Sequence, residues 1–143
     1  MASRREEVVA AVERRARTAL RFSVVQRDAP WPKRAEPGGL VIVRDGDPGE
    51  PEVTLGILSY TYTHDVVLEV FGPAGADGRH ELLDEMLTTL GVAFEEDRSL
   101  GGLVEWLEMS AAAPDDVVVE GGQPIRAAII TVTAIYSTTS PLG

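Results

Sequence analysis

Apolar and polar side chains alternate along two long stretches of this chain. Between residues 58 and 71, the even-numbered positions from Leu58 to Val70 are mostly apolar or aromatic, and the odd-numbered positions are mostly polar or acidic. Residues 125–137 alternate similarly and are rich in β-branched side chains. A period of two is typical of a strand with one buried face. The pattern predicts two long strands, and the first is long enough that we expect one end to project or bend.

Spacings of three and four residues indicate helices. Within residues 1–21, Val8, Val12 and Ala16 recur at this spacing among arginines and glutamates. Ser3, followed three residues later by Glu6, has the spacing of a capping box. We therefore expect an N-terminal helix that begins just after Ser3.

Two more helices are expected in the second half of the chain. Apolar residues from Leu82 to Leu90 form a stripe, which Asp77 is placed to cap and Gly91 to end in a left-handed conformation. An exposed acidic run at 95–97 then precedes a third, shorter helix over residues 100–107.

The remaining segments are rich in turn residues. Residues 28–39 hold three prolines and are expected to form a loop, in which Trp31 either covers the edge of the core or anchors an interface. Residues 40–44 and 53–57 are expected to pair as a hairpin across a turn at 45–49. A brief strand at 117–119, a turn at Gly121 and Gly122, and a free C-terminal arm at 138–143 complete the prediction.

This order of elements predicts one α+β domain spanning residues 1–143. We expect an antiparallel or mixed β-sheet with a hairpin and two long strands, and two to three helices packed mainly on one face. The length is common for a single domain.

Composition narrows the classes of function. The chain has no cysteine, which excludes disulfides, thiolate metal sites and cysteine nucleophiles. Its apolar runs are far shorter than a membrane helix requires, and the N-terminus lacks the apolar core of a signal peptide. We expect a soluble protein that is neither secreted nor bound to a membrane.

Charge is distributed unevenly along the chain. The net charge is −10, yet residues 1–34 hold nine basic and four acidic residues, which leaves +5 there and −15 elsewhere. Opposite potentials of this kind favour head-to-tail association of copies. The alternative is that the basic helix folds back on its own acidic domain. Specific nucleic acid binding is disfavoured because the overall field repels phosphate.

Residues capable of chemistry are few. Two histidines and no cysteine make a zinc or iron site improbable, and we predict neither a metal nor a cofactor. His64 is expected to be a hydrogen-bonded sheet residue rather than a ligand, and His80 a surface residue. Neither a nucleophile motif nor a phosphate-binding glycine loop is present. A carboxylate pair of the glycosidase type stays open, whereas the acids near residue 47 lack the spacing of a calcium loop.

Four segments together resemble the tail terminator proteins of long-tailed phages and gene transfer agent particles, the minor tail protein U-like family. They are the basic N-terminal helix, the stretch YTYTHDVVLEVFG, the following RHELLDEMLTTLG, and the closing PIRAAIITVTAIYSTTSPLG. The similarity spans nearly the whole chain, and it consists of a pattern rather than an invariant motif.

The resemblance implies a structural virion component, not an enzyme. Such a subunit forms a hexameric ring that caps the tail tube, stops its polymerisation and joins the tail to the head connector protein. The implied location is the virion tail, after assembly in the cytoplasm of the bacterial host, with DNA passing through the ring lumen. A ring needs two different complementary patches on each subunit, which the uneven charge is suited to supply.

Residues for these contacts follow from charge and position. The candidates for the subunit interface are Arg14, Arg15, Arg17, Trp31, Glu95, Glu96 and Asp97. The candidates for the contact with the tube protein are Asp45, Asp47, Glu50 and Glu52. Two alternatives remain open: another head–tail connector or tail-completion protein, and a small-molecule-binding or hydrolytic α+β domain that uses His64 and nearby carboxylates.

Overall fold

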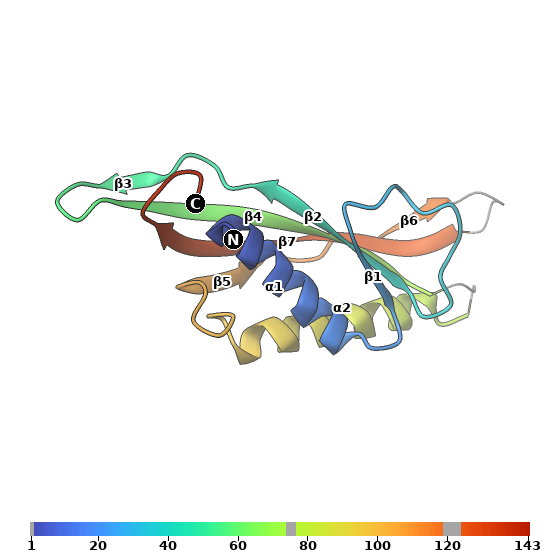
Figure 1. The fold of residues 1–143 in the computed structure, drawn as a ribbon. Helices are drawn as coiled ribbons and strands as arrows, with labels where there is room; N and C mark the ends of the chain where they lie inside the picture. The colour runs from blue at the N-terminus through green and yellow to red at the C-terminus, as the bar shows by residue number, and fades with distance from the viewer. Residues whose placement is uncertain (1, 74–76, 119–123) are drawn as a thin grey trace.

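A computed structural model describes residues 2–73, 77–118 and 124–143 of the chain. In these ranges, two helices lie against one face of a long, twisted seven-stranded sheet (Figure 1). The α+β class predicted from the sequence is therefore confirmed. The elements are α1 (Arg4–Ala19), β1 (Val24–Arg27), β2 (Leu40–Asp47), β3 (Glu52–Thr54), β4 (Ser59–Phe71), α2 (Arg79–Glu96), β5 (Trp106–Met109), β6 (Asp115–Val118) and β7 (Pro124–Thr138).

The sheet is built around the two long strands that alternation predicted. β4 and β7 pair antiparallel from Tyr60 opposite Thr138 to Phe71 opposite Ala127. The strand order is β1-β2-β4-β7-β5, while β3 lies along one end of β4 and β6 along one end of β7. β1 runs parallel to β2 and the other pairs are antiparallel, so the sheet is mixed.

The main core lies between the sheet and the two helices. Even-numbered residues of β4 and β7 face this core, as the alternation predicted, and meet Val8, Val12, Leu83, Leu90 and Phe94 from the helices. Burial of this apolar surface is the main source of stability.

The opposite face of the sheet has a smaller cover at one end. There the loop at residues 28–39 lies over a cluster that includes Ile42 and Phe71. The ring of Trp31 meets that of Phe71 edge to face, with 5.1 Å between centroids, and Trp31 remains 49% exposed. Trp31 thus covers the edge of this second cluster, which was one of the two roles expected for it. The other expected role, as an interface anchor, stays a prediction.

The predicted hairpin between residues 40–44 and 53–57 is wrong. β2 continues to Asp47 and pairs with β4, with an irregular register between Arg44 and Asp47. β3 also pairs with β4, so the reversal falls at residues 55–58. The Asp45-Gly46 pair therefore forms a bulge instead of a turn, and Gly46 has a φ of +69°. β2, the bulge and β3 together run antiparallel to one continuous β4.

The predicted limits of the second helix are also wrong. Gly78, not Asp77, is its N-cap and offers no side-chain cap. The helix passes through Gly91 and ends at Glu96. Phe94 lies one turn beyond Leu90 and is fully buried, so it continues the apolar stripe. Burial of a phenylalanine outweighs the cost of about 1 kcal/mol of a glycine inside a helix.

The predicted third helix does not form. The segment after Asp97 is a series of turns leading into β5, although Leu100, Leu103, Val104 and Leu107 do pack on the core as their spacing suggested. Leu100, Gly101 and Gly102 all have positive φ, which is incompatible with a right-handed helix.

Other departures are smaller. The short strand β1 was not predicted, and β6 begins two residues before the predicted 117–119, whose last residue lies outside the described residues, as do Gly121 and Gly122. The C-terminal arm is not free, because the Tyr62 hydroxyl donates a hydrogen bond to the Pro141 carbonyl oxygen at 3.0 Å.

Candidate interaction surface

Helix α1 presents one face to the core and the other to solvent. Ser3 caps its start, with the hydroxyl oxygen accepting a hydrogen bond from the Glu6 backbone N–H at 3.2 Å. Val8, Val12 and Ala16 are fully buried against the sheet. The arginines between them are thereby held along the outside of the molecule.

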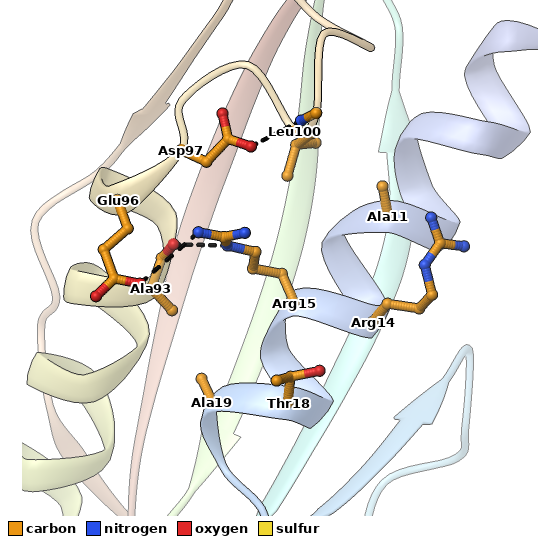
Figure 2. Close-up of a pocket in the computed structure, with 10 residues that line it drawn as sticks. Ala11, Arg14, Arg15, Thr18, Ala19, Ala93, Glu96, Asp97 and Leu100 are labelled. Carbon is orange, nitrogen blue, oxygen red and sulfur yellow. Dashed lines mark hydrogen bonds and ion pairs between the residues drawn. The ribbon is translucent and has the colours of Figure 1, made fainter.

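A groove runs beside the outer face of α1 (Figure 2). Its wider part has a volume of about 640 Å³ and lies between α1, the end of α2 and the turn at 97–101. A second part of about 520 Å³ continues toward the start of α1. Alanines and glycines form much of the lining: Ala2, Ala10, Ala11, Ala19, Ala93, Gly101 and Gly102.

The basic interface candidates have different surroundings. Arg15 points across the groove toward α2, where its Nε donates to the Ala93 carbonyl oxygen at 2.7 Å and a terminal nitrogen lies 3.9 Å from Glu96 (Figure 2). Arg17 bonds to the Glu13 carboxylate at 2.9 Å and to the Val25 carbonyl oxygen. Arg15 therefore contacts the acidic part of its own chain, as the fold-back alternative expected, whereas both partners of Arg17 lie within residues 1–34.

Arg14 differs from its neighbours. It is exposed on the edge of the groove, and it has no salt bridge or hydrogen bond to another residue in the described part of the chain. It is the arginine of these three that is available to an external carboxylate.

The acidic interface candidates lie at the end of α2. Glu95 and Glu96 are exposed in its last turn. Asp97 follows as the C-cap and accepts hydrogen bonds from the Ser99 hydroxyl at 2.6 Å and from the backbone N–H groups of Ser99 and Gly101. The Ser99 hydroxyl first, and then these N–H groups, lower the pKa of Asp97. Asp97 thus holds the turn that forms one wall of the groove.

The tube-contact candidates divide into two pairs. The Asp45 carboxylate is bound by Arg27 at 2.8 Å, and Arg27 also bonds to Glu6 on α1 at 2.7 Å. These bonds with Arg27 lower the pKa of both carboxyl groups and raise that of the guanidinium. Asp47 accepts from the Gly49 N–H, so both residues are engaged within the chain.

Glu50 and Glu52 form the second pair. Both are exposed, and neither has an ion-pair partner in the described ranges. Glu52 lies on the outer strand of the β3–β4 hairpin, which we define as residues 52–61, and Glu50 precedes that strand by two residues.

The β3–β4 hairpin carries an apolar end that sequence reasoning missed. It extends past the body of the sheet (Figure 1), and its turn exposes 81% of Leu55 and 87% of Ile57. Val53 and Leu58 are about half exposed. The signal in the sequence was that residues 53–58 are all apolar or glycine except Thr54.

His64 is fully buried and serves the structure. Its Nε2 lies 2.6 Å from the Asp45 carbonyl oxygen, which can only accept, so Nε2 carries the proton. In the neutral ring, Nδ1 then accepts from the Tyr136 hydroxyl at 2.9 Å. Both nitrogens are occupied, and the predicted role as a hydrogen-bonded sheet residue is confirmed. His80, as expected, is exposed in the first turn of α2.

Within the described ranges, no three His, Cys, Asp or Glu side chains are grouped so that they could hold a metal ion. No helix in the same ranges is long and apolar enough to cross a membrane. In comparisons with known proteins, no family model and no curated protein matches this chain. Two surface features stand out in the part of the chain that the structure describes, the α1 groove and the apolar end of the β3–β4 hairpin.

Proposed function

We propose that this chain is the subunit of a ring that caps the tail tube of a long-tailed phage or a related particle. The ring stops polymerisation of the tube protein and provides the surface that joins the tail to the head connector. The proposal rests on the resemblance in four segments together with the α+β fold, whose helices lie on one face of a sheet built from two long strands.

One observation carries most weight: the exposed apolar end of the β3–β4 hairpin. Leu55 and Ile57 contribute little to the stability of the fold, because their side chains are exposed to solvent. Exposed clusters of large apolar side chains mark surfaces for other proteins. A subunit whose function is assembly requires such a surface, whereas an enzyme requires converging ionisable groups around a site.

The remaining candidate residues fit this assignment by position. Glu50 and Glu52 are exposed beside the hairpin, on a surface available to the tube protein or to a neighbouring subunit. Arg14, in the basic segment 1–34, is exposed and available to an acidic group of a neighbouring subunit. The subunit assembles in the host cytoplasm and remains in the virion tail, where an acidic ring lumen lets DNA pass without adhesion.

The direct test is a measurement of tube length. Tube protein of the same particle is polymerised in vitro with and without this chain, and lengths are measured by electron microscopy. We expect added chain to shorten the tubes and to be visible at one end only. The matched control is the double variant Leu55→Ser with Ile57→Ser. With this variant added, the tubes should be as long as those formed by the tube protein alone.

A different pattern would overturn the proposal. Tubes of unaltered length, with no density added at either end, would exclude a terminator. Binding to the head connector alone would instead identify another head–tail joining component.

A further inference from the structure

The groove beside α1 is longer than either part described so far. A third hollow, of about 450 Å³, is lined by Ile57 and Leu58 at the hairpin and shares Ala2, Arg4 and Glu7 with the second. The second and the widest part share Arg14, Leu100 and Gly101. The three hollows therefore adjoin one another along α1, from the hairpin to its last turn, and we call them together the groove. Since α1 has 16 residues, this is roughly 24 Å at the usual helical rise.

The walls of this groove suit an apolar side chain from outside. Ala10 and Ala11 on one side face Ala93, Leu100 and Gly101 on the other. Side chains this small let an incoming backbone come close. A Cβ added at Gly101 or Gly102 would meet nothing within 4 Å, so the space above this wall is open.

Three of the seven charged side chains that line the groove are ion-paired within the chain. Arg15 lies beside Glu96, Glu6 bonds to Arg27, and Asp97 is bound by the donors of its own turn. Four charged side chains of the lining are left without an ion pair in the described ranges: Arg4, which donates to the Leu103 carbonyl oxygen, Asp97, and the exposed Arg14 and Glu7. Arg14 is the exposed cation where the two widest parts of the groove meet, so an occupant with an acidic side chain beside apolar ones fits there.

The β3–β4 hairpin has this combination. Leu55 and Ile57 at its turn are exposed, and Glu50 and Glu52 precede them without partners. The hairpin cannot fill its own groove. β4 is held along β7 from Tyr60 onward, and Arg14 lies ten residues along α1 from Arg4, about 15 Å at the usual rise.

We propose that the end of the β3–β4 hairpin of one copy lies in the α1 groove of the next copy. Leu55 and Ile57 then contact the alanine and leucine walls, and Glu52 pairs with Arg14. This inference rests on the proposed function in one respect, that copies associate head to tail, and it assigns Glu52 to the neighbouring subunit instead of the tube. Contacts between two different patches can be repeated from copy to copy until a ring closes.

The absence of cysteine allows a clean crosslinking test. Leu55→Cys is placed on the hairpin, and Ala10→Cys in the groove of a second preparation. The two full-length variants are mixed at high concentration and treated with a short bismaleimide. We expect at least tenfold more crosslinked dimer than from Leu55→Cys mixed with Asp84→Cys, an exposed control position on α2. Equal yields in the two mixtures would overturn the proposal.

A variant carrying both Leu55→Cys and Ala10→Cys tests the direction of association. Head-to-tail contacts produce a ladder of covalent oligomers that stops at the ring size. A product that stops at a doubly linked dimer would show a two-fold contact and overturn the proposal.

Charge reversal provides an independent check. Arg14→Glu or Glu52→Arg alone should reduce the crosslink yield at least fivefold, and mixing the two reversed chains, each with its cysteine, should restore most of it. Failure of the mixture to recover, with both variants folded by circular dichroism, would exclude the Glu52 to Arg14 pair. The tube-length assay separates the two proposals. If the crosslinks form but the chain does not shorten the tubes, the proposed function is excluded and the proposed interface stands. If the chain shortens the tubes but the crosslinks do not form, only the proposed interface is excluded.

Discussion

Strand β4 runs through two different environments. At its inner end, Val66 and Leu68 are 0% exposed, covered by both helices and paired on either side. At its outer end, the turn leading into it leaves Leu58 half exposed and Ile57 almost wholly so. Both ends are apolar, but only one is covered by the rest of the chain. The inner end therefore stabilises the fold, whereas the outer end is left uncovered by the rest of the described chain.

The largest difference is expected from truncating side chains at the two ends. Leu68→Ala removes a fully buried side chain and should lower the free energy of unfolding by about 2–5 kcal/mol. Ile57→Ala, at the exposed turn, should change it by less than about 0.5 kcal/mol. Chemical denaturation at low protein concentration measures both. Similar losses would show that the outer end also belongs to the folding core.

The bulge in β2 marks the boundary between the two ends. A Cβ at Gly46 would lie 1.7 Å from the Asp65 carbonyl oxygen, and its φ of +69° adds strain. We expect Gly46→Ala to cost on the order of 1–3 kcal/mol. The matched variant is Gly56→Ala in the hairpin turn, where φ is also positive and the space is open, so only strain is added. Thermal denaturation measures the loss of stability in both variants. An equal loss for Gly56→Ala would show that the close approach of β2 to β4 at Gly46 does not contribute to the cost of Gly46→Ala.

The hydrogen bond between Tyr136 and His64 lies at the same boundary. Tyr136→Phe leaves the buried Nδ1 of His64 without its donor and should cost roughly 1–3 kcal/mol. Tyr60→Phe, which removes a hydroxyl from a partly buried residue of the neighbouring strand β4, should cost less.

Burial also raises the pKa of Tyr136 from 10.0 to about 12. Since the folded pKa is the higher one, this contribution is complete below pH 10 and is lost as the pH rises toward 12. Stability should therefore decline across this range more steeply in the unmodified chain than in Tyr136→Phe. Parallel declines would contradict the burial of this hydroxyl.

Among the variants expected to destabilise the fold, the smallest effect is expected at Arg27, whose guanidinium links β1 to Asp45 of β2 and to Glu6 of α1. Both carboxyl groups have lowered pKa values in the folded state, so their contribution is present above the ordinary values of 3.8 and 4.5 and is lost as pH falls below them. Because the pairs are exposed, Arg27→Gln should cost only about 1 kcal/mol at pH 7. The cost should shrink at acidic pH, and a cost that is constant from pH 7 to 3 would contradict this assignment.

Local pattern predicted the parts of the fold whose cause is local. Alternation located β4 and β7, and the Ser3 capping pattern located the start of α1, because each depends on neighbours in sequence. The same pattern put His64 on the core face. Its exact partners, Tyr136 and the Asp45 carbonyl oxygen, come from strands far away in sequence and were not predictable.

The errors have one physical origin, which is that tertiary contacts overrule local preference. Gly91 is a residue at which helices commonly end, but α2 continues past it because Phe94 is buried in the core. Asp45-Gly46 is a natural turn, but pairing with a continuous β4 makes it a bulge. The groove was not predictable for the same reason, since its walls come from α1, α2 and the turn at 97–103.

The central claim is that the apolar end of the β3–β4 hairpin associates copies of this chain and contributes nothing to its fold. Sedimentation equilibrium from micromolar to millimolar concentration tests it most directly, on the unmodified chain and on Leu55→Ser with Ile57→Ser. We predict that the unmodified chain rises well above its monomer mass of 15.4 kDa, while the double variant stays near that mass with an unchanged free energy of unfolding. Identical masses for the two chains at every concentration would contradict the claim.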